Sequence, residues 1–549
     1  MNRPDPSSDE RPVLVLGPNP TPNGGMHLGH IAGPYLAGDV YARYQRLLGR
    51  KVVFSTGTDD SQTYVIATAA RAGIDPHQLC AESTVLIHDA LRAIGISFDG
   101  FGPFDQAYQD SVLTFFSELH AAGKFRLKTV KLPYLERTGE YVVEGLIEGE
   151  CPTCLASSRG GLCETCCHPN NFDEMVVHST IDKSELPTIR EATIMVFPLE
   201  EYREELTAYH EAWAPYWRPH LTQMVREILA KPLPDMPITF PISWGMKAPF
   251  PETQGQVLNA WLELMPAGMY TTAYAARQLG WDARPGELFE RGTGMRMVHF
   301  LGFDNAFFFT IPHIALLMAH GDRYIRPEWI INNEFYELES EKFSTSKGHV
   351  VSVQDLLAQV PRDVARLYLA LTAPEYQRTT FSRAGLDKVA DNQLVGPWNR
   401  IAGILGKAVA NADSGTPLPV PAAARDRVRA MVERFGVTFE MPGYSLTRSA
   451  QTVLVQIDRL AGHAAALDGT TFDADPEAWG GLFLEVRALL AAVSPILIDL
   501  GEAAKRAGGY DGPLRPDAFD VTEVKPFAPP TMPAETVPTG PAAGTPGSR

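Results

Sequence analysis

Five of the six cysteines lie between residues 151 and 167, in a spacing typical of a metal site. Cys151 and Cys154 form one Cys-x-x-Cys turn, and Cys163 and Cys166 form a second. Each turn aims two thiolates at one point, so the two turns together can surround a zinc ion tetrahedrally. A redox-active pair and a chance clustering of cysteines are the alternatives, but such tight clustering favours zinc. Four protein ligands leave no open position, so we expect the zinc to be structural.

A glycine-rich segment carries two histidines three residues apart. It runs from Asn23 and Gly24 to His27, Gly29 and His30. Glycines let a ligand approach the backbone, and a helix that begins here favours an anion at its N-terminus. Histidines at this spacing face the same side of the first turn, where they could stabilise the developing charge of a triphosphate. Solvent-facing histidines that cap a helix are the alternative for an isolated motif.

A second polar segment lies far along the chain. It contains Lys342, Ser344, Ser346 and Lys347. Lysine and serine in a mobile loop suit contacts to phosphate, although an ordinary solvated loop would have the same residues. Neither segment decides the function alone, so their order and setting carry the argument.

The first segment follows a predicted strand and opens a predicted helix. Residues 13–16 (VLVL) are a short apolar run, and a helical pattern then extends to residue 49. Strand-like runs follow at 52–54, 297–301 and 329–331. Strand, glycine-rich loop, helix and strand open a Rossmann-type, doubly wound parallel α/β sheet. We expect this sheet to be split by the cysteine-bearing insertion and followed by an α-helical bundle.

Composition narrows the classes of function. The 48 Lys and Arg against 65 Asp and Glu give a formal charge of −17, which argues against a DNA-coating or polybasic membrane-binding surface. No apolar run reaches the roughly 20 residues of a membrane span, and the N-terminus lacks a signal-peptide core. We therefore expect a cytoplasmic protein without DNA or membrane partners.

Cys167 could replace Cys166 as a ligand, and Cys80 is expected to be simply buried.

At these motifs the sequence resembles the class I aminoacyl-tRNA synthetases, and within them the methionyl branch. Residues 27–30 (HLGH) are similar to the HIGH signature, and residues 342–346 (KFSTS) to the KMSKS loop. Residues 57–60 (GTDD) and 298–304 (VHFLGFD) are similar to segments beside the active site, and the cysteine turns resemble the zinc insertion of that branch. The order of the motifs, over about residues 12–400, makes the resemblance specific.

The resemblance implies an ATP-dependent ligase. Its members bind ATP with Mg²⁺, form an aminoacyl-adenylate with release of pyrophosphate, and pass the acyl group to tRNA. Catalysis of this kind rests on positioning and on charge stabilisation of the transferring phosphate. Methionine would be the default amino acid, and we expect a monomer.

The resemblance also divides the chain and assigns its residues. The expected segments are the first catalytic half (1–125), the zinc-knuckle insertion (126–240), the second catalytic half (241–345), the stem region with the mobile loop (346–390), a helical anticodon-binding-like domain (391–510) and a disordered proline-rich tail (511–549). The catalytic positions are His27, His30, Lys342 and Lys347. The other ATP-binding positions are Asn23, Gly24, Gly29, Gly302, Asp304, Ser344 and Ser346. The amino-acid-binding positions are Asn19, Thr21, Asp60 for the α-ammonium, and Trp261 and His299 in the side-chain pocket.

Three departures from the family pattern bear on function. Thr345 stands where the KMSKS loop has its second lysine, although Lys347 could substitute for it. Loss of a comparable donor costs ~2.7–4 kcal/mol in other systems. Asn19 and Thr21 bring polar atoms into a pocket that a thioether would line with apolar groups, which predicts a more hydrophilic side chain. The Pro-Trp pair with which the methionyl branch reads an anticodon is missing from the helical region.

Two further interpretations therefore stay open beside tRNA charging with methionine. A diverged paralogue would adenylate a different amino or related acid and pass it to another acceptor, as in an amide ligation. A non-catalytic tRNA-binding or regulatory module would have lost the ATP site. The basic stretch Arg425, Arg427, Arg429 and Arg434 is equally typical of a tRNA-binding face and of a solvated helix face.

Overall fold

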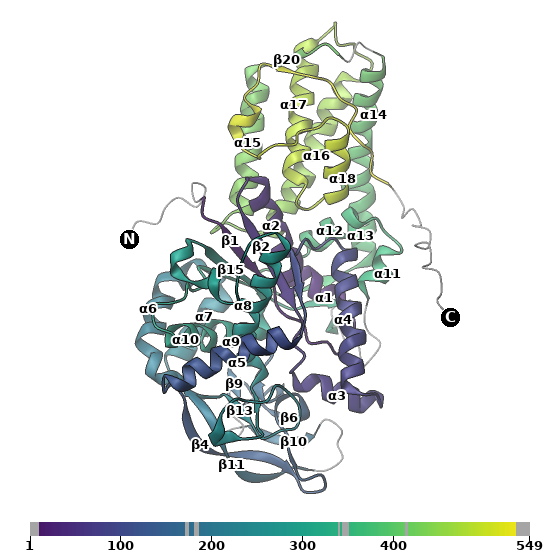
Figure 1. Ribbon diagram of the computed structural model, residues 1–549. Helices are drawn as coiled ribbons and strands as arrows, with labels where there is room; N and C mark the ends of the chain where they lie inside the picture. Colours follow the sequence, from purple (N-terminus) through teal and green to yellow (C-terminus); the bar gives the residue numbers. More distant parts are fainter. Residues whose placement is uncertain are drawn as a thin grey trace, which may run out of the picture.

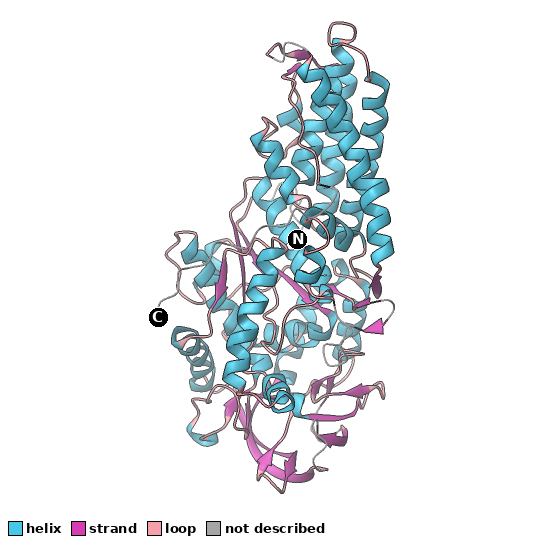
Figure 2. Ribbon diagram, turned by 90° about the vertical axis from the view of Figure 1, so that its right-hand side faces the viewer, coloured by secondary structure: helices cyan, strands magenta, loops and turns pink. Residues whose placement is uncertain are grey.

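The computed structural model describes residues 10–170, 175–180, 186–338, 341–342, 351–411 and 415–533. The molecule is elongated, with a parallel α/β sheet in its middle, an insertion rich in β-strands at one end and a helical bundle at the other (Figure 1). Figure 2 shows the same division, with long helices in the upper half and most strands at the lower end. No helix in the described part of the chain has the length and apolar character to cross a membrane.

Five parallel strands form the central sheet, in the order β16-β15-β1-β2-β3. Their bounds are Val13–Leu16 (β1), Val52–Gly57 (β2), Gly100–Gly102 (β3), Arg296–Gly302 (β15) and Trp329–Asn333 (β16). Every residue of β1 is buried, because this central strand is covered on both faces and must be apolar throughout. Strand order reverses between β1 and β15, so a crevice opens at their carboxyl ends. The predicted doubly wound sheet, split by an insertion, is confirmed.

Helix α8 (Ala260–Gln278) lies against β2 and β3 at a short distance. A Cβ atom on Gly100 or Gly102 would approach an atom of α8 to 2.6 Å, so only glycine permits this packing. The close approach aims the first turn of α8, with Trp261, at the crevice.

The other helices of the α/β part are shorter or more peripheral. They are α1 (Leu28–His30), a π-helical turn (Ile31–Tyr35), α2 (Leu36–Leu47), α3 (Thr63–Ala72), α4 (Pro76–Ala93), α5 (Gln106–Ala121), α9 (Ala306–Thr310), α10 (Pro312–Ala319), α11 (Val353–Leu357) and α12 (Arg362–Leu371). A small sheet near the crevice joins β17 (Tyr336–Leu338) to β18 (Glu341–Lys342) and β19 (Thr379–Phe381).

The insertion is built on a long antiparallel pair. Strand β4 (Arg126–Leu135) pairs with β11 (Thr188–Pro198), flanked by β5 (Glu140–Tyr141) and β12 (Asp235–Pro237). A second sheet holds β6 (Ile147–Glu150), β7 (Ser157–Ser158) and β10 (Val176–Thr180), and a small pair holds β8 (Gly161–Leu162) and β9 (Pro169–Asn170). Helices α6 (Arg203–Trp213) and α7 (Pro219–Leu229) and the pair of β13 (Thr239–Phe240) with β14 (Val257–Leu258) lead back to the central sheet.

Helices dominate the rest of the chain. They are α13 (Arg383–Val389), a π-helical stretch (Ala390–Val395), α14 (Gly396–Ala410), α15 (Ala422–Phe439), α16 (Leu446–Leu467), α17 (Pro476–Val493) and α18 (Ile498–Arg506). Amphipathic spacing predicts α15, whose Val428, Met431, Val432 and Phe435 are all buried.

The prediction of a disordered tail from residue 511 is wrong for residues 511–533. Strand β21 (Glu523–Val524) pairs with β20 (Leu418–Pro419). Farther on, the indole N–H of Trp398 donates to the Pro530 carbonyl at 2.9 Å. The few apolar residues of this segment, including Phe527 and Met532, are buried on the bundle. Proline prevents a helix in this segment, but it permits an extended chain that packs on the bundle. The local sequence does not reveal the partners of such a chain.

Buried ion pairs join the bundle to the catalytic half. Asp39 on α2 and Arg366 on α12 are both fully buried and meet at 2.6 Å. Arg366 also donates to the carbonyls of Pro495 and Ile496, in the turn between α17 and α18. One guanidinium thus satisfies groups from two distant parts of the chain.

We predict that Arg366→Met lowers the free energy of unfolding by about 3–5 kcal/mol, because the Asp39 carboxylate would stay buried with only Arg43 left as a charged partner. The matched control is Arg383→Met, which breaks the exposed pair with Asp387 and should cost less than about 1 kcal/mol. Urea denaturation followed by fluorescence measures both. Equal losses for the two variants would contradict the assigned role of Arg366.

Candidate active site

A cleft with both polar and apolar walls opens at the carboxyl edge of the central sheet, in the crevice between β1 and β15. Ten of the positions predicted from sequence line it: Asn19, Thr21, Asn23, Gly24, His27, Gly29, His30, Trp261, Gly302 and Asp304. They come from four regions of the chain, namely the loop after β1, the start of α1, the start of α8 and the end of β15. The tertiary structure therefore brings most of the predicted nucleotide and amino-acid positions to one place.

The two histidines are held by the backbone around them. His27 caps α1, where its Nδ1 accepts from the Gly29 N–H at 3.1 Å, and the His27 N–H donates to Nδ1 of His30 at 3.3 Å. Because both Nδ1 atoms accept, each neutral ring carries its proton on Nε2. Burial lowers the pKa of His30 to about 4, so this ring is neutral at physiological pH and still offers an N–H donor.

The second predicted loop begins and ends near the cleft. Lys342 lies in β18, whose backbone pairs with β17, and of its side chain nothing is described. The chain returns beside the histidines, where the Leu28 N–H donates to the Val351 carbonyl at 3.2 Å and His27 forms a β-bridge with Ser352. The predicted phosphate contacts Ser344, Ser346 and Lys347, and the departure at Thr345, lie outside the described residues.

Three carboxyl groups cluster beneath the cleft. Asp59 lines the cleft, whereas Asp60, its neighbour in sequence, is not among the lining residues. Glu263 on α8 accepts hydrogen bonds from Tyr108 at 2.7 Å and Ser61 at 3.1 Å. Each carboxyl keeps one buried oxygen with no partner among the described residues. Such a cluster favours a cation. The predicted ammonium position at Asp60 therefore lies among acidic groups, although Asp59 is the one that lines the cleft.

Burial also changes the protonation of these groups. It is the main cause of the raised pKa values of Asp59 and Asp60, and nearby Glu263 raises that of Asp59 further. Burial raises the pKa of Glu263 to about 7, against the hydrogen bonds from Tyr108 and Ser61 that lower it. Of the three groups, Glu263 is therefore partly protonated near neutral pH.

Trp261 and His299 occupy the inner side of the site. The Trp261 ring stacks on Phe308 with centroids 4.6 Å apart and planes 3° apart. His299 lies on β15 and lines a smaller cavity next to the cleft, together with His313. His313 was not predicted, because it lies on an apolar helix without a motif around it.

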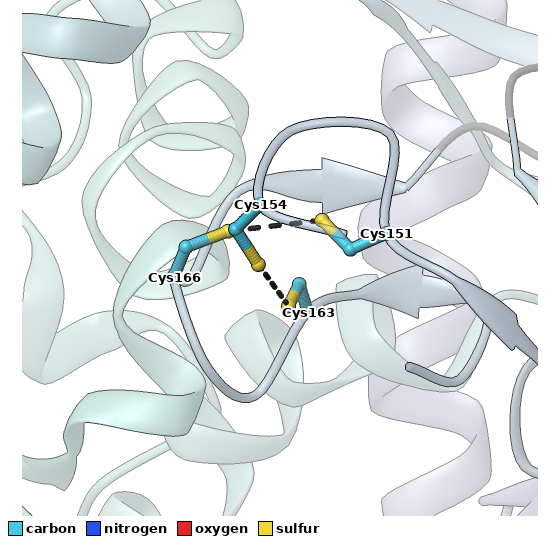
Figure 3. A group of neighbouring side chains, drawn as sticks. All are labelled: Cys151, Cys154, Cys163 and Cys166. Carbon is cyan, nitrogen blue, oxygen red and sulfur yellow. Dashed lines mark hydrogen bonds between the residues drawn. The ribbon is translucent and has the colours of Figure 1, made fainter. Parts of the chain in front are cut away.

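The four predicted cysteine ligands converge in the insertion (Figure 3). Their sulfur atoms all lie within 4.8 Å of one another, with Cys151 and Cys166 at 3.8 Å and Cys154 and Cys163 at 3.7 Å. Tetrahedral Zn–S bonds of about 2.3 Å require sulfur–sulfur distances of about 3.8 Å. The donor set and the spacing therefore suit one zinc ion.

The fifth cysteine of the cluster does not join these four. The Cys167 thiol donates to the Phe303 carbonyl at 2.9 Å and accepts from the Phe307 N–H at 3.3 Å. The expectation that Cys167 could replace Cys166 is therefore wrong, because the side chain is used to attach the knuckle to the end of β15. Cys80 is buried in α4, as predicted.

This attachment brings the insertion to the cleft. Glu164, between two of the zinc-type cysteines, and Tyr64, on α3, both line the cleft. Neither stands in a motif that signals such a position, so sequence reasoning missed both.

The basic stretch on α15 is largely used within the bundle. Arg425 pairs with Asp520 at 3.1 Å, Arg427 with the buried Glu485 at 2.7 Å, and Arg429 with Asp426 at 3.0 Å. Arginines paired in this way favour a structural role for this stretch over a face that binds nucleic acid.

We predict that Glu263→Gln changes the pH dependence of stability. The pKa of Glu263 is higher in the folded protein than in the unfolded chain, so the protonated carboxyl stabilises the folded protein fully below about pH 4.5. This stabilisation, up to about 3 kcal/mol, is lost as the pH rises to about 7. Glutamine can still accept from Tyr108 and Ser61 but cannot ionise. The melting temperature of the variant, relative to wild type, should therefore be higher at pH 8 than at pH 5.

The matched control is Glu82→Gln on the exposed face of α4, whose effect should not depend on pH. A pH-independent difference for Glu263→Gln would show that the carboxyl does not titrate in this range.

Comparison with known proteins extends the geometric result. Residues 13–402 match the family described as tRNA synthetases class I (M). A methionine--tRNA ligase of Chlorobium limicola is 32% identical over 379 residues, which cover 67% of this chain and 54% of that protein. One from Chlorobium luteolum is 27% identical over 530 residues, 92% of this chain and 74% of that protein. The chain spans about half the length of the first of these and of several similar relatives.

A solved structure supports the fold. The methionyl-tRNA synthetase of Mycobacterium tuberculosis bound by methionyl-adenylate superposes with a TM-score of 0.73 at 21% identity, covering 95% of this chain and 99% of that one. The family match covers the split sheet, the cysteine insertion and both halves of the cleft. The chain belongs to the class I tRNA synthetases of the methionyl type.

Proposed function

We propose that the chain is an ATP-dependent ligase that activates an amino acid as an aminoacyl-adenylate and transfers it to tRNA. The observation that carries this proposal is the pair His27 and His30 in the crevice, each with Nδ1 occupied by a backbone N–H. Two Nε2–H donors beside a helix N-terminus suit the phosphates of ATP. The relative from M. tuberculosis, with methionyl-adenylate bound, supports the same chemistry.

The first step joins the amino acid to AMP. A carboxylate oxygen of the amino acid attacks the α-phosphorus of ATP, and the bond to the bridging oxygen breaks to release pyrophosphate. His27 and His30 would donate to phosphate oxygens as negative charge develops, and Lys342 and Lys347 would add contacts from the second loop. Mg²⁺ would accompany the phosphates. Asp59 and Asp60 would hold the α-ammonium group.

The second step moves the acyl group. A hydroxyl of the terminal ribose of tRNA attacks the acyl carbon, its proton leaves, and AMP departs. None of these bonds is made to the protein, so the residues of the chain act by position and charge.

We expect amino-acid-dependent ATP–pyrophosphate exchange by the full chain, measured over a panel of amino acids. His30→Ala should lower kcat/KM for exchange by about 100-fold or more, because one positioned donor is worth about 10²–10³ in rate. The control His463→Ala, exposed on α16, should leave the rate unchanged. Absence of exchange with every amino acid, or an unaffected His30→Ala variant, would argue against the proposal.

A non-decoding acceptor is the second candidate function. The pairing of Arg427 with the buried Glu485 favours it, because this cation is already used within the bundle. Exchange activity without aminoacylation of purified tRNA would support this alternative.

We also propose that Cys151, Cys154, Cys163 and Cys166 hold one structural zinc ion. Four thiolates complete its tetrahedral shell, so the ion would stabilise the insertion and take no part in the reaction. A cluster of thiolate ligands of this kind is typical of a reducing compartment, which supports a cytoplasmic location.

Metal analysis of protein purified without chelator should find about one zinc per chain. Cys154→Ser should lose most of that zinc and melt at a lower temperature, because a structural site contributes to folding. Cys80→Ser, which changes a buried cysteine outside the cluster, should keep the zinc. A wild-type chain without zinc, or a Cys154→Ser variant with a full equivalent, would contradict the assignment.

A further inference from the structure

A small cavity lies at the inner end of the cleft, and Asn19 and Leu264 line both spaces. The end of β1, the second turn of α8, β15 and α10 form its walls. Under the proposed function, the amino acid would have its ammonium and carboxylate in the cleft. Its side chain would then point into this cavity. A Cβ on Gly268, which faces the cavity from α8, would have no heavy atom within 4 Å, so this wall leaves room.

Two buried histidines face this space with unused ring nitrogens. His299 is 4% exposed, and neither of its nitrogens has a hydrogen-bond partner among the described residues. His313 is 1% exposed and donates from Nε2 to the Trp261 carbonyl at 2.7 Å, which leaves its Nδ1 as an acceptor without a partner in the same part of the chain.

Both rings are neutral. Burial lowers the pKa of His299 to about 3 and that of His313 to about 4, and nearby His313 lowers the pKa of His299 further. His299 therefore presents one donor and one acceptor, and His313 presents one acceptor. Among the described residues that line the cavity, none carries a permanent charge.

A thioether cannot satisfy these atoms. It has no donor and is only a weak acceptor, so a methionine side chain would leave buried ring nitrogens without partners. A hydroxyl or carboxamide group both donates and accepts, and can therefore pair with His313 Nδ1 and with His299. A site built for hydrogen bonds discriminates strongly against analogues that lack them.

We propose that this cavity selects an amino acid with an uncharged, hydrogen-bonding side chain (a hydroxyl or a carboxamide), and that His299 and His313 determine this specificity. The inference rests on the proposed function, but it concerns binding and can be tested without turnover.

Calorimetric titration of the full chain with free amino acids tests the proposal. Glutamine and methionine are similar in length and differ in polarity, so they form the central comparison. Asparagine, threonine and homoserine separate carboxamide from hydroxyl, and norleucine provides an apolar reference. At least one polar amino acid should bind ten times more tightly than methionine.

His299→Leu should reduce this preference at least tenfold, because it removes a donor and an acceptor while breaking no hydrogen bond within the described residues. His299→Gln, which restores both kinds of group, should retain most of the preference, and His463→Leu on the exposed face of α16 should retain all of it. The melting temperature of each variant verifies that it is folded.

Methionine binding as tightly as every polar amino acid, no binding of any polar amino acid, or an unchanged ratio in His299→Leu would each overturn the proposal. The exchange assay judges adenylation separately. A preference for polar amino acids without exchange would support the cavity assignment and contradict the ligase function. Exchange with methionine as the preferred substrate would support the ligase function and contradict the cavity assignment.

Discussion

The buried contact between Asp39 and Arg366 is the interaction on which the arrangement of the molecule depends. Asp39 belongs to α2, which follows the histidine motif directly, and Arg366 belongs to α12, which follows the second loop. The Asp39 carboxylate also accepts from Arg43 and from the Ser97 N–H, so it joins three elements of the α/β part. A charge with no access to water must be fully paired, which leaves little freedom in how these elements meet.

Two further networks of buried ion pairs lie between the α/β part and the helical bundle. Arg218 pairs with Glu375 at 2.9 Å, and Glu375 also accepts from the start of α16 at Ser445. Arg296, at the start of β15, shares Glu440 with Arg50. Each network joins the α/β part to the helical bundle. The bundle is therefore held against the sheet by directional bonds as well as by apolar packing, and its orientation relative to the cleft is well defined.

At the other end of the molecule a thiol performs a comparable task. Cys167 follows the last zinc-type ligand and bonds to the backbone of Phe303 and Phe307, beside Asp304 of the cleft. The knuckle is thus attached at the point where β15 ends, and Glu164 is carried into the cleft wall. A structural metal in the insertion would therefore stabilise one wall of the site without touching a substrate.

Local signals in the sequence were sufficient for features that depend on neighbours along the chain. An apolar four-residue run predicts β1, two Cys-x-x-Cys turns predict the sulfur cluster, and the spacing of His27 and His30 predicts that both face one side of a turn. Order along the chain was sufficient for the family. Local signals were absent where the partners are distant in sequence: His313 joins the small cavity beside the cleft from an apolar helix.

The sequence by itself determined the doubly wound sheet, the metal-type cysteines and most of the polar residues that line the cleft. Only the tertiary structure decided the roles of Cys167, of the arginines on α15 and of residues 511–533. Their chemistry is compatible with several partners, and each partner lies far away in sequence. A cysteine can bind a metal or form hydrogen bonds that attach one segment to another, and an arginine can bind nucleic acid or a buried carboxylate such as Glu485. Which of these forms depends on what folding brings within hydrogen-bonding distance, because unpaired polar groups are costly to bury.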